Sequence, residues 1–146
     1  MSKISKQQYS KMVKTASPNS PIVRDCILAF LIGGLICVIA QLINTMWLNF
    51  DLKKDDAAAL TSASMIFIGA LLTGLNVYDD IAFYGGAGTL VPITGFANSI
   101  VSPAMEYKTE GFILGVGVKM FTIAGPVLVF GTVASVIYGI ILSFII

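Results

Sequence analysis

The chain contains no histidine, two cysteines and few charged residues. Charged residues make up 12% of its 146 residues, whereas a soluble domain carries about a quarter. Without histidine, the Ser–His–Asp and Cys–His mechanisms and the usual zinc sites are excluded. Cys26 and Cys37 do not form a CxxC motif, and we interpret them as small apolar residues. We therefore expect no enzyme, no cofactor and no metal site.

Long uncharged stretches are what the chain has in abundance. Hydrophobic residues are 56% of the sequence and the mean hydropathy is +0.88. An uncharged stretch of 23 residues at 26–48 would measure about 34 Å as a helix, enough to cross a hydrocarbon core of roughly 30 Å. A second apolar stretch covers 57–77. The sequence therefore predicts an all-α polytopic membrane protein, with a single transmembrane domain at 25–146 and about four to five membrane helices.

Residues 1–24 form a polar, basic N-terminal tail. Five of the nine basic residues lie in it, at Lys3, Lys6, Lys11, Lys14 and Arg24. Under the positive-inside rule, this distribution puts the N-terminus in the cytoplasm. The segment Ser17–Pro21 (SPNSP) should break any helix that runs from the tail into the membrane. We expect a solvated tail that sets topology, or one that also contacts anionic headgroups. Neither alternative implies a nucleic-acid partner.

The uncharged segment 81–105 is long enough to span a bilayer but is interrupted by glycine and proline. Lipid cannot hydrogen-bond free backbone groups, so such a segment must be covered by protein or line a wet cavity. Transporters and channels place binding sites and filters at broken segments of this kind. We expect it to span the membrane or to re-enter. Its candidate residues for a pore or substrate path are Gly85, Gly86, Gly88, Pro92, Thr94, Asn98 and Ser99.

Several charged residues flank the apolar stretches. Asp79 and Asp80 precede the glycines; they would cap a helix boundary, or line a vestibule or bind calcium. Glu106 and Glu110 stand four residues apart and would face one way on a helix, as partners for a lysine or as part of a solvated turn. We treat these four acids as candidate gating or partner contacts.

Lys119 is the one charge inside the long apolar tract 112–146. It would face the solute path as a further path candidate, or it would snorkel from a helix end. The 35 residues of the tract would measure about 52 Å as one helix, too long for an ordinary span. We therefore expect a short or re-entrant helix that ends near Lys119 or Gly125, followed by a final span to about Ile146.

Four motifs carry a resemblance to a known family. They are YDDIAFYGGAGTLVPITGFANS (Tyr78–Ser99), EYKTEG (Glu106–Gly111), KMF (Lys119–Phe121) and AGPV (Ala124–Val127). Through them the chain resembles the SpoVA sporulation family over about residues 25–146. Within the family, its length and basic N-terminal extension most resemble the AC branch, and the AEb branch comes second.

The resemblance implies a channel or transport subunit of a complex in the inner spore membrane. That complex moves dipicolinic acid, largely as its calcium chelate, into the forespore during sporulation and out again at germination, with a response to membrane tension. Its implied partners are other SpoVA subunits (AD, AE or AEb), membrane lipid and the solute, in a homo- or hetero-oligomer. The alternative is a non-conducting structural subunit of the same complex.

Overall fold

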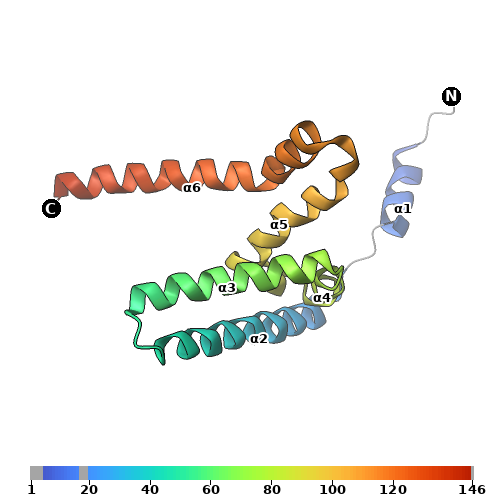
Figure 1. The fold of residues 1–146 in the computed structure, drawn as a ribbon. Helices are drawn as coiled ribbons and strands as arrows, with labels where there is room; N and C mark the ends of the chain where they lie inside the picture. The colour runs from blue at the N-terminus through green and yellow to red at the C-terminus, as the bar shows by residue number, and fades with distance from the viewer. Residues whose placement is uncertain (1–4, 17–19, 146) are drawn as a thin grey trace.

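The computed structural model describes residues 5–16 and 20–145, without the side chain of Lys14. Every regular element in these two ranges is a helix, which confirms the all-α prediction (Figure 1). In chain order the elements are α1 (Lys6–Ala16), α2 (Ile22–Leu48), α3 (Lys54–Gly74), α4 (Tyr78–Gly85), the 3-10 helix η1 (Gly86–Leu90), α5 (Pro92–Glu106), the 3-10 helix η2 (Lys108–Glu110), the π-helix η3 (Phe112–Gly117) and α6 (Val118–Ile145).

Three segments of the described chain are long and apolar enough to cross a membrane. They are Ile22–Leu48, Lys54–Gly74 and Phe112–Ile145. The first two confirm the spans expected at 26–48 and 57–77, although both helices begin earlier than predicted. The prediction placed the boundaries at the last charged residues. A helix continues through charges at its end because their side chains can extend toward the headgroups.

Helices α2 and α3 form an antiparallel hairpin that polar side chains hold together. Asn44 Nδ2 donates a hydrogen bond to Thr61 Oγ1 over 3.1 Å, and Trp47 Nε1 donates to Ser64 Oγ over 3.2 Å. Such bonds between membrane helices contribute about 0.6 to 2 kcal/mol each. Asn44 thus joins the two helices, whereas the nearby Gln41 is exposed on α2.

The buried face of α3 is a single row of residues at intervals of four. The row consists of Ala57, Thr61, Met65, Gly69 and Thr73. Residues four apart form a ridge along one side of a helix, and small side chains in that ridge let neighbouring backbones approach closely. This row is where α2 and α5 pack against α3.

The broken segment enters and leaves the bundle at the same end. In Figure 1, α4 lies at the end of α3, α5 begins part of the way back along the bundle, and α5 then returns toward the end from which α4 started. The segment is therefore re-entrant, which decides between the two alternatives that the sequence left open. The turn between α2 and α3 and the C-terminal end of α6 both lie on the opposite side of the picture, although α6 stands apart from the hairpin.

The expected break in the C-terminal tract is absent from the described residues 118–145. Helix α6 runs through both Lys119 and Gly125 and contains Pro126 in its interior. The prediction of two separate helices was wrong. A proline inside a helix removes one backbone hydrogen bond and bends the helix without ending it. Neighbouring helices, Ser/Thr side chains, water or local adjustments of the helix satisfy the freed carbonyl group, since lipid cannot. Figure 1 shows the first turns of α6 inclined to its long straight remainder.

The N-terminal tail is more ordered than the sequence indicated. Residues Lys6–Ala16 form helix α1, which stands apart from the bundle (Figure 1). Whether the tail is solvated or contacts anionic headgroups stays a prediction. The break expected at Ser17–Pro21 is consistent with the end of α1 at Ala16 and the start of α2 at Ile22, but residues 17–19 lie outside the described ranges.

Candidate functional site: the re-entrant break

A glycine conformation ends α4. Gly86 has φ 48° and ψ −124° and forms the C-terminal cap of this helix. A side chain disfavours positive φ, whereas glycine adopts it freely. The structure thus confirms that Gly86 holds a bend for which a side chain is unsuited.

Gly88 serves packing and not a bend of the backbone. Gly88 is not among the glycines with positive φ. A Cβ atom at Gly88 would overlap the carbonyl oxygen of Ala29 in α2, and a Cβ atom at Gly33 would lie 3.0 Å from the carbonyl oxygen of Gly88. The 3-10 helix therefore lies backbone against backbone on α2. The physical reason for glycine at this position is steric.

The depth of this contact follows from the position of Gly33. Gly33 lies seven positions after Cys26, where the uncharged stretch of α2 starts, which corresponds to about 10 Å along the helix axis. A hydrocarbon core is roughly 30 Å thick. The contact between η1 and α2 therefore lies inside the core, about a third of the way through the first span.

A buried tyrosine, which the sequence analysis did not select, connects α4 to η1. Tyr78 is 3% exposed and its hydroxyl donates a hydrogen bond to the carbonyl oxygen of Thr89 over 2.8 Å. Thr89, also buried, donates to the Gly86 carbonyl over 2.9 Å. Together these bonds satisfy backbone oxygens that the non-helical turn leaves free, as an apolar environment requires. A tyrosine at the start of an otherwise apolar segment was the signal for this role.

Helix α5 starts inside the bundle with proline and packs on α3. Pro92 is its first residue, where a missing N–H costs nothing. A Cβ atom on Gly69 would lie 3.3 Å from the Thr94 Cα atom, so α5 and α3 approach closely at this point. Thr94 is 4% exposed, and its buried hydroxyl oxygen has no hydrogen-bond partner.

Asn98 lies one turn further along α5 and contacts α3. The Thr73 hydroxyl lies 2.9 Å from Asn98 Oδ1 and 2.7 Å from the Gly69 carbonyl oxygen. A hydroxyl has one proton, so the two oxygens compete for it; with the amide turned by 180°, the Asn98 NH₂ group would donate and both contacts would be hydrogen bonds. Ser99 donates to the Phe96 carbonyl over 2.8 Å. That these residues line an aqueous path stays a prediction.

Two of the hollows beside the re-entrant segment contain candidate site residues. The first has a volume of about 470 Å³ and lies between α2, α3 and α4; its lining is Ile32, Leu35, Ile36, Ile39, Met65, Ile68, Leu72, Tyr78, Asp80, Ile81, Tyr84 and Thr94. The second has a volume of about 280 Å³ and is lined by Thr73, Asn76, Asp79, Ser102, Met105 and Glu106. The first is mainly aliphatic and aromatic, whereas the second carries two carboxylates.

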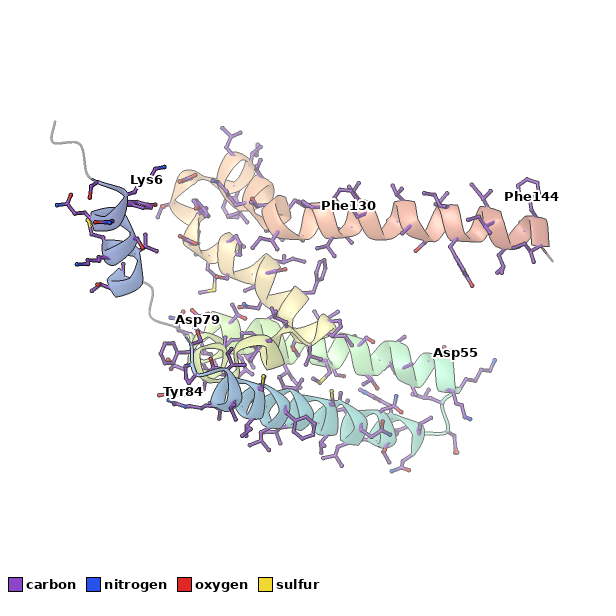
Figure 2. All side chains as sticks on the ribbon, turned by 180° about the vertical axis from the view of Figure 1, so that it is seen from behind. Lys6, Asp55, Asp79, Tyr84, Phe130 and Phe144 are labelled. Carbon is purple, nitrogen blue, oxygen red and sulfur yellow. The ribbon has the colours of Figure 1, made fainter. Side chains whose placement is uncertain are left out.

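The four candidate acids are thus separated by the fold. Asp79 and Glu106 share the smaller hollow, Asp80 borders the larger one, and Glu110 is exposed in η2. Asp79 and Asp80 lie in the first turn of α4, where negative charge complements the helix dipole, and α4 has no side-chain cap. The two aspartates therefore act on the start of α4 through their charge and do not cap it with a side-chain hydrogen bond, as was predicted. Figure 2 shows Asp79 at the same end of the bundle as Tyr84. Glu106 ends α5, so the two glutamates do not share one helix as expected.

Lys119 contacts an aromatic ring. Its Nζ atom lies 4.1 Å from the centroid of the Tyr107 ring, and both residues are half-buried. A cation in this position is attracted by the ring, typically by about 0.5 to 2 kcal/mol. Tyr107 was not selected from the sequence, because no pattern connects residues that lie on either side of η2 and η3.

No cluster of three or more histidine, cysteine or acidic residues occurs within the described ranges. The calcium-binding alternative for Asp79 and Asp80 therefore has no cluster of three such side chains to support it in that part of the chain. Two or three carboxylates with additional oxygen atoms would be needed for such a site.

The comparisons with known proteins agree on one family. The model of the SpoVAC/SpoVAEB sporulation membrane proteins matches residues 25–141. The chain is 50% identical over 137 residues to stage V sporulation protein AC of Bacillus subtilis (strain 168), an alignment that covers 93% of this chain and 91% of that protein. No solved structure gives a significant match. The matched region contains most of each spanning helix of the described chain and the whole re-entrant segment, and the chain belongs to the SpoVAC/SpoVAEB family of sporulation membrane proteins.

Proposed function

We propose that this chain is a channel subunit that moves dipicolinic acid, as its calcium chelate, across the inner spore membrane during sporulation and germination. The observation that carries the proposal is the re-entrant segment, whose half-helix α5 begins inside the bundle after a break that lies within the uncharged depth of α2. Half-helices that end at mid-membrane are a common way to build solute sites in transporters.

The chemistry of the solute is compatible with this element. Dipicolinate is a planar dianion, and its calcium chelate is close to neutral. The N-terminus of a helix carries a partial positive charge that favours carboxylates. The acidic pair Asp79 and Glu106 at the smaller hollow would favour the calcium of the chelate, whereas aliphatic surroundings would close the path by dewetting.

A second candidate function is that of a structural subunit that does not conduct. It is favoured by the satisfaction of polar groups within one chain: Thr73, Ser99 and Thr89 all donate internally, and the larger hollow is mainly apolar. Under the channel proposal, the aqueous path forms between subunits. We propose assembly with other SpoVA subunits, among them AD and AE or AEb, in the spore membrane with the N-terminus in the cytoplasm, and no catalytic activity.

Flux through liposomes tests the channel proposal. Purified protein in liposomes loaded with calcium dipicolinate should release the solute faster than protein-free liposomes. The same preparation under osmotic downshift should release it faster still if membrane tension opens the path. Release equal to that of protein-free liposomes, both for this chain alone and for the chain reconstituted with its SpoVA partners, would contradict the channel function and leave the structural one.

Substitutions of Lys119 test whether its charge acts on the solute or only makes a structural contact. If its ammonium attracts the carboxylated solute, Lys119→Met should lower flux several-fold while membrane insertion stays unchanged. Lys119→Arg keeps the cation and its contact with the Tyr107 ring, and should retain flux if the surroundings accept the planar guanidinium. The measurement is flux per inserted protein for the three forms. Unchanged flux for Lys119→Met would leave Lys119 as a snorkelling residue only.

A further inference from the structure

Helix α1 separates its apolar and polar side chains onto opposite faces. Tyr9, Met12, Val13 and Ala16 follow the spacing i, i+3, i+4 and i+7, so they form one stripe. At about 100° per residue, Gln7 and Lys11 project from the opposite side. The three large residues of the stripe are 64%, 58% and 43% exposed, in the order Tyr9, Met12 and Val13. No part of the described chain covers this face.

The link to α2 keeps this helix close to the membrane. Five residues, 17–21, separate the end of α1 from the start of α2. Fully extended, they and their flanking bonds reach about 20 Å. Because α2 is a spanning helix that begins at Ile22, α1 cannot move far from the bilayer surface at which α2 enters. In Figure 1, α1 lies beyond the end of the bundle at which α4 lies.

The charge around α1 has a single sign. Residues 1–24 contain five basic residues and no acidic residue, and Lys6 and Lys11 lie in α1 with exposed side chains. Each basic residue near an anionic membrane surface contributes about 1 kcal/mol of attraction. Lys11 lies opposite the apolar stripe, and Lys6 lies at its edge, seven residues before Val13. A helix with an apolar stripe and basic residues beside and opposite it is typical of segments that lie in the membrane interface.

We propose that α1 binds flat to the anionic surface of the membrane that α2 crosses. Tyr9, Met12 and Val13 insert at the boundary between headgroups and acyl chains, while Lys6 and Lys11 contact anionic headgroups. Two observations favour lipid as the partner of the apolar face: the short link to α2 keeps α1 near the bilayer, and residues 1–24 carry only positive charge. The binding does not depend on whether the chain conducts dipicolinate.

Tryptophan fluorescence of the full chain in vesicles tests this placement. In a Trp47→Phe background, Tyr9→Trp puts a single indole on the apolar stripe, and Gln7→Trp puts it on the opposite face without a change of charge. Vesicles contain phosphatidylglycerol and phosphatidylcholine, the latter brominated near the top of its acyl chains. Quenching by bromine should be roughly twofold or more stronger for Tyr9→Trp, since an interfacial helix buries its apolar face about 5–10 Å into the boundary.

Each alternative placement gives a different result. Equal and weak quenching at both positions would mean a solvated helix and would overturn the proposal. Blue-shifted emission from Tyr9→Trp without bromine quenching would mean a protein partner, and would overturn it as well. In a third form, Lys6→Gln and Lys11→Gln are added to Tyr9→Trp; its quenching should fall toward that seen in vesicles without phosphatidylglycerol. If neutralisation leaves quenching unchanged in both kinds of vesicle, the anionic recognition is wrong.

Discussion

Spores whose only copy carries Gly88→Val are expected to accumulate little or no dipicolinic acid. A Cβ atom at this position would overlap the Ala29 carbonyl oxygen, which belongs to the backbone of α2 and cannot rotate away. The 3-10 helix would have to separate from the first span. Forcing extra atoms into a packed contact costs about 1–3 kcal/mol, and we expect the upper end of that range because the obstacle is backbone.

The control for this substitution is Gly34→Val. Gly34 is in α2, one residue after the Gly33 that faces Gly88, and a Cβ atom there would meet nothing within 4 Å. The Gly34→Val protein should therefore insert into the membrane and melt like the unchanged chain, and spores that carry it should accumulate dipicolinic acid normally. The measurements are thermal stability of the purified protein in detergent and dipicolinate content per spore. Normal values for Gly88→Val would show that the contact between η1 and α2 is not needed.

Gly86→Ala is expected to destabilise the protein by about 1–3 kcal/mol, the typical cost of a side chain held in a sparsely populated backbone conformation. The cause differs from that at Gly88, since a Cβ atom on Gly86 would meet nothing within 4 Å but would have to adopt φ 48°. The cost should therefore depend little on side-chain size, and Gly86→Leu should melt close to Gly86→Ala.

Gly88→Ala and Gly88→Val provide the comparison. The loss of stability should be larger for valine than for alanine, because the space beside Gly88 is occupied by the backbone of α2. Thermal melting of the four variants, together with solute flux per inserted protein, separates the two mechanisms. A neutral Gly86→Ala would mean that the turn between α4 and η1 can relax to an ordinary conformation, and that positive φ at this position is dispensable.

The sequence alone determined the class of the protein and the location of its irregular element. The low charge and two long apolar stretches are sufficient to predict a polytopic helical membrane protein, because crossing a bilayer imposes length and composition on each segment. Glycines and prolines at 85–103 were sufficient to place the broken segment, because lipid tolerates such interruptions only under protein cover.

Tertiary structure decided which way that segment runs and why each glycine is needed. Both termini of a 25-residue uncharged stretch can lie on one side of a membrane or on two, and only the packing of α5 along the Gly69–Thr73 end of α3 makes it return. Gly86 and Gly88 look alike in sequence, yet one is required by its own φ and the other by the carbonyl group of Ala29.

The difference between local sequence patterns and tertiary packing also explains the failed predictions. Lys119 and Gly125–Pro126 suggested a helix end, but a proline within apolar surroundings bends α6 without ending it. The contact of Lys119 with Tyr107 joins residues separated by two short irregular helices, and no local pattern encodes it. Local chemistry fixes what each segment can be in a membrane, whereas long-range packing selects its direction and its neighbours.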